Sequence, residues 1–298
     1  MRVIGYRHQR TLAGTAVVAG RGLIAGAPVV ARFVPAPVDS GVSFRRTDLP
    51  GAPTIPARAD RVTGTQRRTT LGPAYTGVSL VEHVLAALAG LRIDNCVVEL
   101  DAGEPPGLDG SAAGFVAALS AAGTVHQPAR RPILTPTRTA LVRAAGATLA
   151  LHSADPGDMA LRATYRLDYG PGAPIPPQAY TADVCPEMFG REIAPCRTFL
   201  TEAECGALKT QGVGRHLEPA DILVFGAHGP IDNRLRFADE PARHKVLDLI
   251  GDLALCGFDL AGHVVAYRSG HALNVELARA LSRKSSGRKV GTSVKQAA

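Results

Sequence analysis

Residues 79–90 have the sequence SLVEHVLAALAG, and the fold can be worked out from this stretch. Ser79 is a suitable N-cap, Glu82 stands three residues later as its capping-box partner, and Gly90 is a typical C-terminal stop signal. Valine, leucine and alanine fill most of the positions between them. The pattern predicts a short apolar helix with a buried environment.

The same order of elements occurs twice along the chain. After this helix the sequence predicts a buried strand over 95–100 and a second helix over 110–122. Residues 242–255, 262–267 and 271–283 predict helix, strand and helix again. Two halves of similar α/β design are therefore expected. If their helices face each other, one helix from each half meets at a shared seam, which is a common place for a pocket.

Further strands are predicted on either side of a break in the middle of the chain. Alternating apolar residues at 14–18 and 29–34, with glycines between them, predict a β-meander at the start. Residues 141–151 and 159–167 predict strands of the second half. Between these groups, the proline- and arginine-rich residues 127–137 (QPARRPILTPT) predict a break in the chain, after which a second set of strands begins.

This segment is the best candidate for a domain boundary. We expect a first α/β domain over residues 1–128 and a second over residues 129–283. Residues 284–298 are rich in lysine and arginine and are expected to form a basic, flexible tail. The length of 298 residues is about twice that of a usual domain, so each half can bury a core of its own.

Composition narrows the class of protein. Hydrophobic residues make up 46% and charged residues 20%, as is ordinary for a folded globular protein. No stretch has the roughly 18 uninterrupted apolar residues of a membrane span, and residues 1–14 lack the apolar core of a signal peptide. A cytoplasmic protein without stable membrane insertion is expected. The five cysteines are widely spaced without a CxxC pair, which favours reduced cysteines used in packing.

The net charge of +7 bears on the kind of partner. A nucleic-acid-binding module is a weak alternative, because aromatic residues make up only 5%, tryptophan is absent and no helix carries a basic stripe. We therefore expect no nucleic acid partner. Arg45, Arg46, Arg67 and Arg68 suit a phosphorylated substrate or transient contact with a membrane surface, although a solvated basic face is the plainer interpretation.

The predicted helix over 242–255 (ARHKVLDLIGDLAL) carries a narrow polar stripe. His244, Asp248 and Asp252 are four residues apart and lie on one face, while aliphatic residues occupy much of the rest. An imidazole and a carboxylate one turn apart can bind one zinc ion, and catalytic zinc usually takes three protein ligands and a water. When this helix is considered by itself, the competing interpretation is that the polar stripe simply faces solvent.

The equivalent helix of the first half carries Glu82 and His83 in an otherwise aliphatic run. Burial of an unpaired carboxylate and an unpaired imidazole in such a run would cost several kcal/mol. A metal ligand next to a general base would explain why both residues stand there. A core histidine with a satisfied hydrogen bond remains the alternative for His83. Near the predicted start of the last helix, His271 is a candidate acid, and Asp252 could accept a hydrogen bond from it and favour the imidazolium form.

Five motifs follow one another in an order that strongly resembles the UDP-3-O-acyl-N-acetylglucosamine deacetylases of lipid A synthesis. They are SLVEHVLAALAGLRIDN, LDGSAAGFV, RTF, LRFADEPARHKVLDLIGDL and AYRSGHALN, and the N-terminal PAPVDSGVSFRRTDLP agrees with them. The resemblance covers about residues 10–283. It implies an α+β fold of two related two-layer α/β sandwich domains, packed with their helical layers facing and each with a small insert. The active site would lie between the helical layers.

The resemblance also implies the activity. The reaction is the zinc-dependent hydrolysis of the N-acetyl group of UDP-3-O-(3-hydroxyacyl)-N-acetylglucosamine, with release of acetate, so the partner is an acylated UDP-sugar. Carried over by position, the zinc ligands would be His83, His244 and Asp248, with Glu82 as the general base. We expect the protein to act as a monomer.

Further roles follow from the same resemblance. His271, oriented by Asp252, would be the acid or electrostatic partner at the leaving amine. Lys245 would support charge near the metal, Thr198 would help to hold the oxyanion, and Phe199 would lie near the substrate.

Several positions depart from the family pattern. Ile24 replaces a histidine in a glycine-rich turn, and Arg67 and Arg68 stand in a segment that is usually apolar or neutral. After RTF the chain continues with leucine and threonine at 200–201, and the glycine-rich stretch of the second insert is shortened to GVGRHLEPAD at 212–221. In the family this insert forms the passage for the acyl chain.

These departures leave two alternatives beside the lipid A deacetylase. One is a paralogous zinc deacetylase that acts on a different N-acetylated substrate. The other is a catalytically silent binding homologue, which would be marked by loss of a ligand or of the base. His83, His244, Asp248, Glu82 and His271 are all present.

Overall fold

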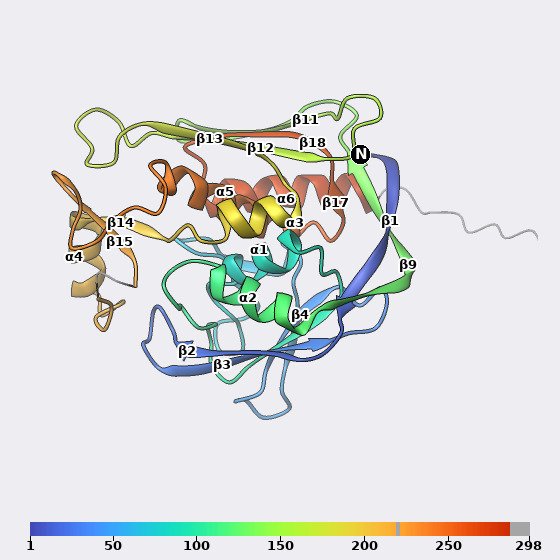
Figure 1. Cartoon of the computed structure of the whole chain (residues 1–298), viewed down its shortest axis with the longest axis horizontal. Coiled ribbons are helices and arrows are strands. Elements are labelled where there is room, and N and C mark those ends of the chain that lie inside the picture. The colour runs from blue at the N-terminus through green and yellow to red at the C-terminus, as the bar shows by residue number, and fades with distance from the viewer. Residues whose placement is uncertain (219–220, 287–298) are drawn as a thin grey trace, which may run out of the picture.

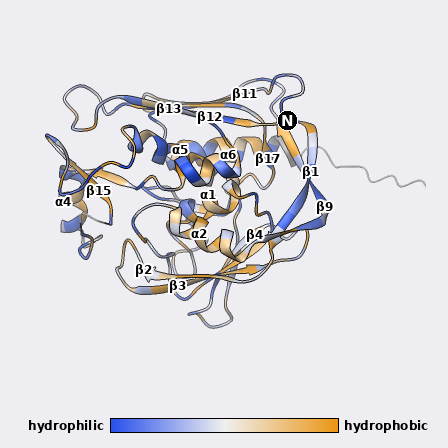
Figure 2. Cartoon of the chain, in the orientation of Figure 1, coloured by the Kyte–Doolittle hydropathy of each residue, from blue (hydrophilic) through white to orange (hydrophobic). Residues whose placement is uncertain are grey.

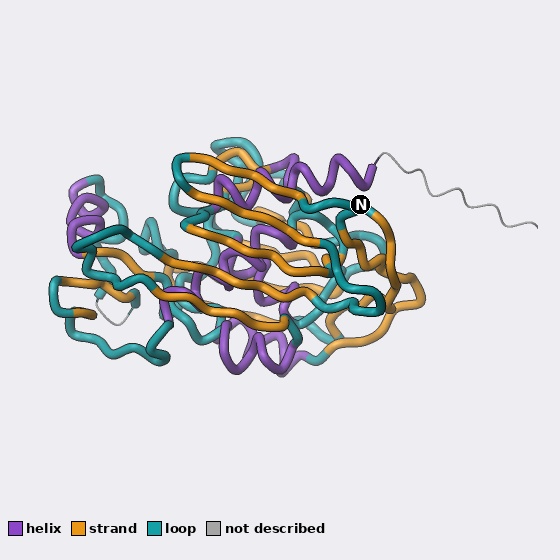
Figure 3. Tube along the Cα trace, turned by 90° about the horizontal axis from the view of Figure 1, so that it is seen from above, coloured by secondary structure: helices purple, strands orange, loops and turns teal. Residues whose placement is uncertain are grey.

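The structure is a computed structural model that describes residues 1–218 and 221–286, with backbone alone for 284–286. Two five-stranded sheets form its outer layers, and the main helices lie between them (Figure 1). Seen from above, the strands of one sheet run side by side across the helices, and a smaller unit with a helix of its own projects at one end (Figure 3). This is the α+β architecture of two facing α/β layers that the sequence predicts.

The two large sheets have the same topology. The first has the strand order β2-β3-β8-β4-β5 and the second has the order β10-β11-β18-β12-β13. In each sheet one pair is parallel, β4 with β8 and β12 with β18, and the other neighbours are antiparallel. The bounds in the first sheet are Ala16–Arg21, Pro28–Pro35, Cys96–Leu100, Val42–Arg46 and Thr54–Pro56 in that order. Those in the second are Ala140–Ala144, Ala147–His152, Gly262–Tyr267, Leu161–Leu167 and Gln178–Asp183.

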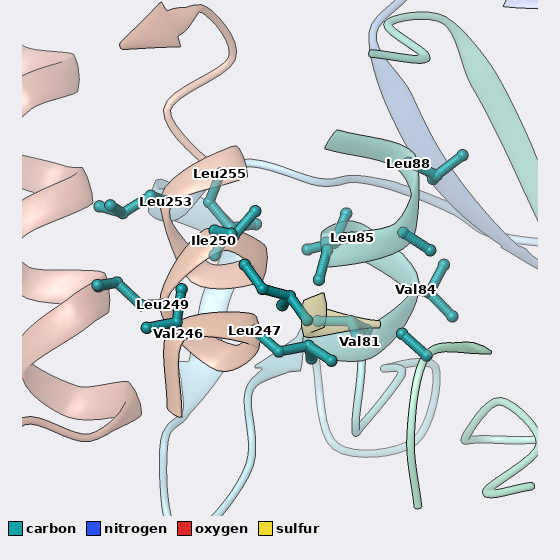
Figure 4. Packing of buried hydrophobic residues seen from close by; sticks show 14 of the residues in the cluster. Val81, Val84, Leu85, Leu88, Val246, Leu247, Leu249, Ile250, Leu253 and Leu255 are labelled. Carbon is teal, nitrogen blue, oxygen red and sulfur yellow. The ribbon is translucent and has the colours of Figure 1, made fainter. Parts of the chain in front are cut away.

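Four helices fill the space between these sheets. They are α1 (Glu82–Gly90), α2 (Ala113–Ala122), α5 (Glu240–Ala254) and α6 (His271–Ser286). Helices α1 and α5 pack against each other through a buried cluster in which Leu247 and Ile250 of α5 face Val81 and Leu85 of the first half (Figure 4). Since burial of a large aliphatic side chain contributes about 1.5–3 kcal/mol, this contact is a main source of cohesion at the seam.

A long two-stranded ribbon connects the halves at one side. Strand β1 (Arg2–Leu12) pairs with β9 (Thr124–Thr135), and β17 (Asp259–Leu260) adds a short parallel strand. Strand β9 is mostly hydrophilic, in contrast to the orange segments of the sheets and inner helices (Figure 2). The break expected at 127–137 needs correction, because β9 runs without interruption through most of this segment. Its prolines are tolerated because β9 is an edge strand over much of its length, with a register shift beside Pro128.

Several predicted boundaries also need correction. The prediction that Ser79 caps the helix is wrong. Leu80 has a left-handed φ of 57°, and α1 begins only at Glu82, without a side-chain cap. The single strand predicted at 141–151 is a hairpin, in which Ala145 and Gly146 both have positive φ. Helix α2 begins three residues later than predicted, after Gly110 with a φ of 77°.

The C-terminal prediction is corrected in part. Helix α6 continues to Ser286 and so takes in the first residues of the expected tail. Residues 287–298 lie outside the described part of the chain. A domain boundary at residue 128 stays a prediction.

Smaller elements complete the chain. In the first half they are a 3₁₀ turn at Ala59–Arg61 and the paired strands β6 (Val62–Gly64) and β7 (Thr70–Leu71). In the second half they are α3 (Pro186–Met188), a π-helical turn at Phe189–Ile193, β14 (Phe199–Thr201), α4 (Glu202–Thr210), β15 (Leu223–Gly226) and β16 (Gly229–Pro230). The unit formed by β14, α4, β15 and β16 is called the insert below.

Two predictions from composition can be compared with the structure. The five cysteines all lie in described residues and are free, as expected. Over residues 1–218 and 221–286, no helix combines the length and apolar character that crossing a membrane requires.

Candidate metal centre and active site

Three side chains from the two halves meet at the seam between α1 and α5. His83 comes from the first turn of α1, and His244 and Asp248 are one turn apart on α5. One ligand atom from each lies within 4.8 Å of the other two. The Nε2 atoms of both histidines are 3.5 Å from Asp248 Oδ1. The structure thus brings together the three residues predicted as metal ligands.

The orientation of His244 suits a metal ligand. Its Nδ1 lies 3.0 Å from the carbonyl oxygen of Cys196, which can only accept, so Nδ1 carries the proton and Nε2 keeps a free lone pair. Burial lowers the pKa of His244 to about 4, which keeps the imidazole neutral near pH 7. A neutral ring fixed by a backbone carbonyl is the usual state of a metal-binding histidine.

Asp248 supplies a buried negative charge, and one of its two carboxylate oxygens has no hydrogen-bond donor among the described residues. Its Oδ2 accepts a hydrogen bond of 2.7 Å from Lys245 Nζ. Burial alone would raise the pKa of Asp248, but the charge of Lys245 helps to hold it well below its usual range. Among the described residues Oδ1 is buried without a hydrogen-bond donor. Such an oxygen is costly unless a cation faces it, so the donor set fits a divalent metal with three protein ligands.

Glu82 lies next to His83 and is almost completely buried, with 2% of its surface exposed. Its Oε2 accepts a hydrogen bond of 3.0 Å from the backbone N–H of Thr69, which replaces the expected capping role. Burial raises the pKa of Glu82. A carboxylate with a raised pKa beside a metal site is suited to accept and release a proton.

His271 begins α6 and faces the same centre. Its Nδ1 lies 2.9 Å from Asp252 Oδ2, so the expected pairing of these two residues is present. Its Nε2 lies 4.0 Å from Glu82 Oε1 and 3.9 Å from Asp248 Oδ2. Burial would lower the pKa of His271, but the carboxylates of Asp252 and Glu82 outweigh it and raise the pKa to about 9. The imidazolium form is thereby favoured.

The supporting residues around Asp252 were missed by sequence reasoning. Thr69 Oγ1 donates to Asp252 Oδ1 at 2.6 Å, and Asn274 Nδ2 donates to Asp252 Oδ2 at 2.9 Å. Ser269 Oγ in turn donates to Asn274 Oδ1 at 3.1 Å. Ser269 and Asn274 fall within the motif SGHALN, which could have drawn attention to them, whereas no local pattern points to Thr69.

A cavity of about 500 Å³ opens over these groups. Glu82, His83, His244, Asp248 and His271 all line it. Its walls therefore combine the charged centre with space for a substrate of moderate size.

Thr198 and Phe199 also line this cavity. The ring of Phe199 packs edge-on against the ring of His244, with 5.9 Å between centroids. The backbone N–H of Thr198 donates to the Gly110 carbonyl at 2.7 Å, which ties the start of the insert to the first half. Both predicted residues thus lie on the cavity, and Phe199 also contacts one of the candidate metal ligands.

The insert gives the cavity an apolar wall. Aliphatic side chains line it here, namely Leu200, Leu208, Val213, Leu217, Ile222 and Val224. Leu23 and Ile24 of the first half lie on the same cavity, and the backbone N–H of Ile24 donates to Glu104 Oε2 at 2.9 Å. Residues 219–220 of the shortened stretch lie outside the described residues. The cavity as a whole offers an apolar channel next to a polar reaction centre.

The four arginines noted in the sequence fall into two groups. Arg45 and Arg46 of β4 make ion pairs with Glu99 of β8 and with Asp48 in the turn after β4, and neither arginine lines the cavity. Arg67 and Arg68 line the cavity. Arg67 is paired with Glu204 of the insert at 3.1 Å.

Known proteins are similar to this chain over most of its length. The family model described as UDP-3-O-acyl N-acetylglycosamine deacetylase matches residues 9–283. A UDP-3-O-acyl-N-acetylglucosamine deacetylase of Thermosynechococcus vestitus is 41% identical over 281 residues, which cover 93% of this chain and 94% of the relative. A protein of the same name from Bdellovibrio bacteriovorus is 37% identical over 275 residues, with 91% and 88% covered.

A longer relative is also similar. The bifunctional enzyme LpxC/FabZ of Chlorobaculum tepidum is 39% identical over an alignment of 303 residues that covers 93% of this chain. The match spans 64% of the length of that relative.

Proposed function

The chain belongs to the UDP-3-O-acyl N-acetylglycosamine deacetylase family, and on that premise we propose that it holds a zinc ion with His83, His244 and Asp248. It is a deacetylase of lipid A biosynthesis. We propose further that its substrate is UDP-3-O-(3-hydroxyacyl)-N-acetylglucosamine, from which it releases acetate. The observation that carries the metal assignment is the buried Oδ1 of Asp248, which lacks a hydrogen-bond donor among the described residues and has the Nε2 atoms of both histidines 3.5 Å away.

The chemistry follows from the groups around this centre. A bound zinc ion supplies a Lewis acid that lowers the pKa of water and polarises the acetyl carbonyl. Glu82 accepts the proton of the attacking water, because it is buried beside His83 and has a raised pKa. Its Oε2 is held by Thr69, which leaves Oε1 turned towards His271.

His271 handles the proton at the other end of the scissile bond. In its imidazolium form it donates from Nε2 to the nitrogen of the leaving amine, while Asp252 fixes Nδ1. Because its pKa is raised to about 9, this form is present at neutral pH.

Lys245 and Thr198 stabilise negative charge. The Nζ of Lys245 is bound to Asp248, so its positive charge lies at the edge of the metal centre. Thr198 lines the cavity and is placed to support the oxyanion of the tetrahedral intermediate.

The substrate is placed by the chemistry of the cavity walls. The aliphatic side chains of the insert suit the acyl chain, and Phe199 gives an apolar contact next to the sugar. Arg68 lies on the cavity and suits the negative charge of a nucleotide diphosphate. We place the reaction in the cytoplasm, since the free cysteines suit a reducing compartment, with a monomeric enzyme in transient contact with the membrane surface.

The test is release of acetate from UDP-3-O-(3-hydroxyacyl)-N-acetylglucosamine by the purified, zinc-loaded protein. Glu82→Gln should abolish turnover while the protein still binds about one equivalent of zinc. Glu99→Gln, on the outer face of β8 and paired with arginines, is the matched control and should leave turnover unchanged.

Two results would change the assignment. If zinc binds but this substrate releases no acetate, while another N-acetylated sugar does, the protein is a deacetylase of different specificity. A different substrate specificity is favoured by Ile24, Arg67 and Arg68, which depart from the family pattern and line the cavity. If no N-acetylated substrate reacts, the chain is a silent binding homologue.

A further inference from the structure

We propose that Thr69 is a positioning residue that holds the general base and the acid pair in place at the same time. This inference rests on the proposed function of Glu82, His271 and Asp252. Thr69 comes from the loop before β7, Glu82 from α1 and Asp252 from α5. One residue therefore connects three segments at the seam, although none of its polar atoms needs to touch the substrate.

The two hydrogen bonds of Thr69 go to different carboxylates. Its backbone N–H donates to Glu82 Oε2 at 3.0 Å, and its hydroxyl donates to Asp252 Oδ1 at 2.6 Å. Thr69 and Asp252 are completely buried, and Glu82 is 2% exposed. Hydrogen bonds to ionised groups in a site without water are stronger than those at the surface, so both contacts restrict the carboxylates.

The hydroxyl of Thr69 completes the set of donors around Asp252. His271 Nδ1 and Asn274 Nδ2 are both at Oδ2, 2.9 Å away in each case, and Thr69 alone donates to Oδ1 in the described part of the chain. Without this hydroxyl, Oδ1 would be buried without a donor. The carboxylate would then be free to turn, and His271 would turn with it.

The loop that carries Thr69 is held independently of its side chain. The carbonyl oxygen of Thr69 accepts from the N–H of Val81, and the next residue, Thr70, shares a hydrogen bond of 3.0 Å with Ser79 Oγ. Removal of the Thr69 hydroxyl should therefore leave the backbone contact to Glu82 in place. A β-branched side chain also has a restricted χ1, so the hydroxyl is aimed at Asp252 before substrate arrives.

The test uses Thr69→Val, which removes the hydroxyl and keeps the shape of the side chain, in the full-length zinc-loaded protein. We expect kcat to fall roughly 10- to 100-fold, the range found when outer groups that orient active residues are lost. KM for the acylated UDP-sugar and the zinc content should stay near those of the parent protein. Thr69→Ser should restore most of kcat. Thr181→Val is the matched control and should leave kcat unchanged, because it lies on β13 of the second sheet and its hydroxyl shares only an exposed hydrogen bond of 2.8 Å with Thr164.

A second readout does not depend on turnover or on zinc. In the metal-free protein, the Nδ1 proton of His271 donated to Asp252 should give a proton NMR signal far downfield, which His271→Gln removes. Thr69→Val should shift or broaden this signal, and Thr181→Val should not. If Thr69→Val does not fold, Thr69→Ala removes the same hydroxyl without adding atoms and replaces it in both experiments.

The outcomes separate this inference from the proposed function. If the parent protein releases no acetate, the proposed function fails, and the NMR signal still decides whether Thr69 holds the His271–Asp252 pair. If the parent is active but Thr69→Val keeps its kcat and its signal, the positioning role is overturned. Loss of zinc in Thr69→Val, or failure of Thr69→Ser to restore kcat, would also overturn it, because either result indicates a general structural role.

Discussion

Gly251 of α5 packs against the backbone of Glu82 of α1 so closely that a β-carbon at position 251 would overlap the Glu82 carbonyl oxygen. The two helices thus approach through backbone atoms at this point. Glu82 is followed by His83, and Gly251 lies three residues after Asp248. The absence of a side chain at Gly251 therefore lets a ligand on one helix reach the ligands on the other.

Gly251→Ala should separate the two helices. A methyl group cannot fit against a backbone carbonyl, so we expect a loss of about 1–3 kcal/mol in the free energy of unfolding and a weaker zinc site. Denaturant unfolding and zinc titration measure the two effects. Gly206→Ala in α4 is the matched control, since a β-carbon there has no neighbour within 4 Å. Unchanged zinc affinity in Gly251→Ala would contradict the link between helix approach and metal site.

His83→Ala should remove the metal site with little damage to folding, because His83 is the most exposed of the three ligands. We expect about one equivalent of zinc in the parent protein and almost none in the variant, measured by metal analysis after dialysis. Zinc should raise the melting temperature of the parent only, because a ligand stabilises the folded state that binds it. The control is His263→Ala, on the second sheet, which should bind zinc as the parent does. If His83→Ala binds as much zinc as the parent, the assignment of His83 as a ligand is refuted.

The activity should fall on the alkaline side as His271 loses its proton. The pKa of His271 in the metal-free protein is raised to about 9, because nearby carboxylates outweigh the effect of burial. A bound cation would lower this value, so the alkaline limb of kcat/KM is expected at or below about pH 9. Asp252→Asn removes one of these charges and should move the limb to lower pH. A limb at the same pH in Asp252→Asn would indicate that another group titrates.

Asp259 should stabilise the fold at neutral pH and not in acid. It receives hydrogen bonds from Arg131 Nε at 2.6 Å and from Arg7, which join β17 to the β1–β9 ribbon. Burial alone would raise the pKa of Asp259, but the two guanidinium groups lower it. The contribution of Asp259 to the free energy of unfolding is therefore complete above the pKa of an aspartate in the unfolded chain, about 3.9. It is lost as the pH falls through the lower pKa of Asp259 in the folded protein.

Asp259→Asn should accordingly lower the free energy of unfolding by about 1–3 kcal/mol at pH 7, with the difference from the parent shrinking below about pH 4. Urea unfolding at several pH values measures this. Asp60→Asn, which breaks an exposed pair with Arg58, is the control and should have little effect. A difference that does not change with pH would mean that packing, and not charge, accounts for the loss.

Local patterns predicted the helices and the residues that share a helix face. His244, Asp248 and Asp252 are four residues apart, and a helical period places them on one side whatever the rest of the chain does. The strand at 262–267 and the start of the last helix at His271 were also predicted correctly, because glycine and serine separate two strongly patterned segments.

Local patterns failed where distant segments compete for the same groups. Ser79 and Glu82 have the spacing of a capping box, but the Glu82 carboxylate is taken by the Thr69 N–H, and the Ser79 hydroxyl pairs with Thr70. The prolines in 127–137 indicate a break, but pairing with β1 makes most of the segment a strand. In both cases tertiary contacts outweighed a local preference.

The sequence by itself determined the repeated α/β order, the polar stripe on α5 and the Glu82–His83 pair on α1, because each depends on neighbours within a few residues along the chain. Only the tertiary structure decided that His83 lies beside His244 and Asp248, and that Thr69 bonds to both Glu82 and Asp252. These contacts join segments far apart in the chain. Their geometry depends on how closely α1 and α5 pack. The glycine at position 251 permits this close approach, but the spacing of residues within one helix cannot specify it.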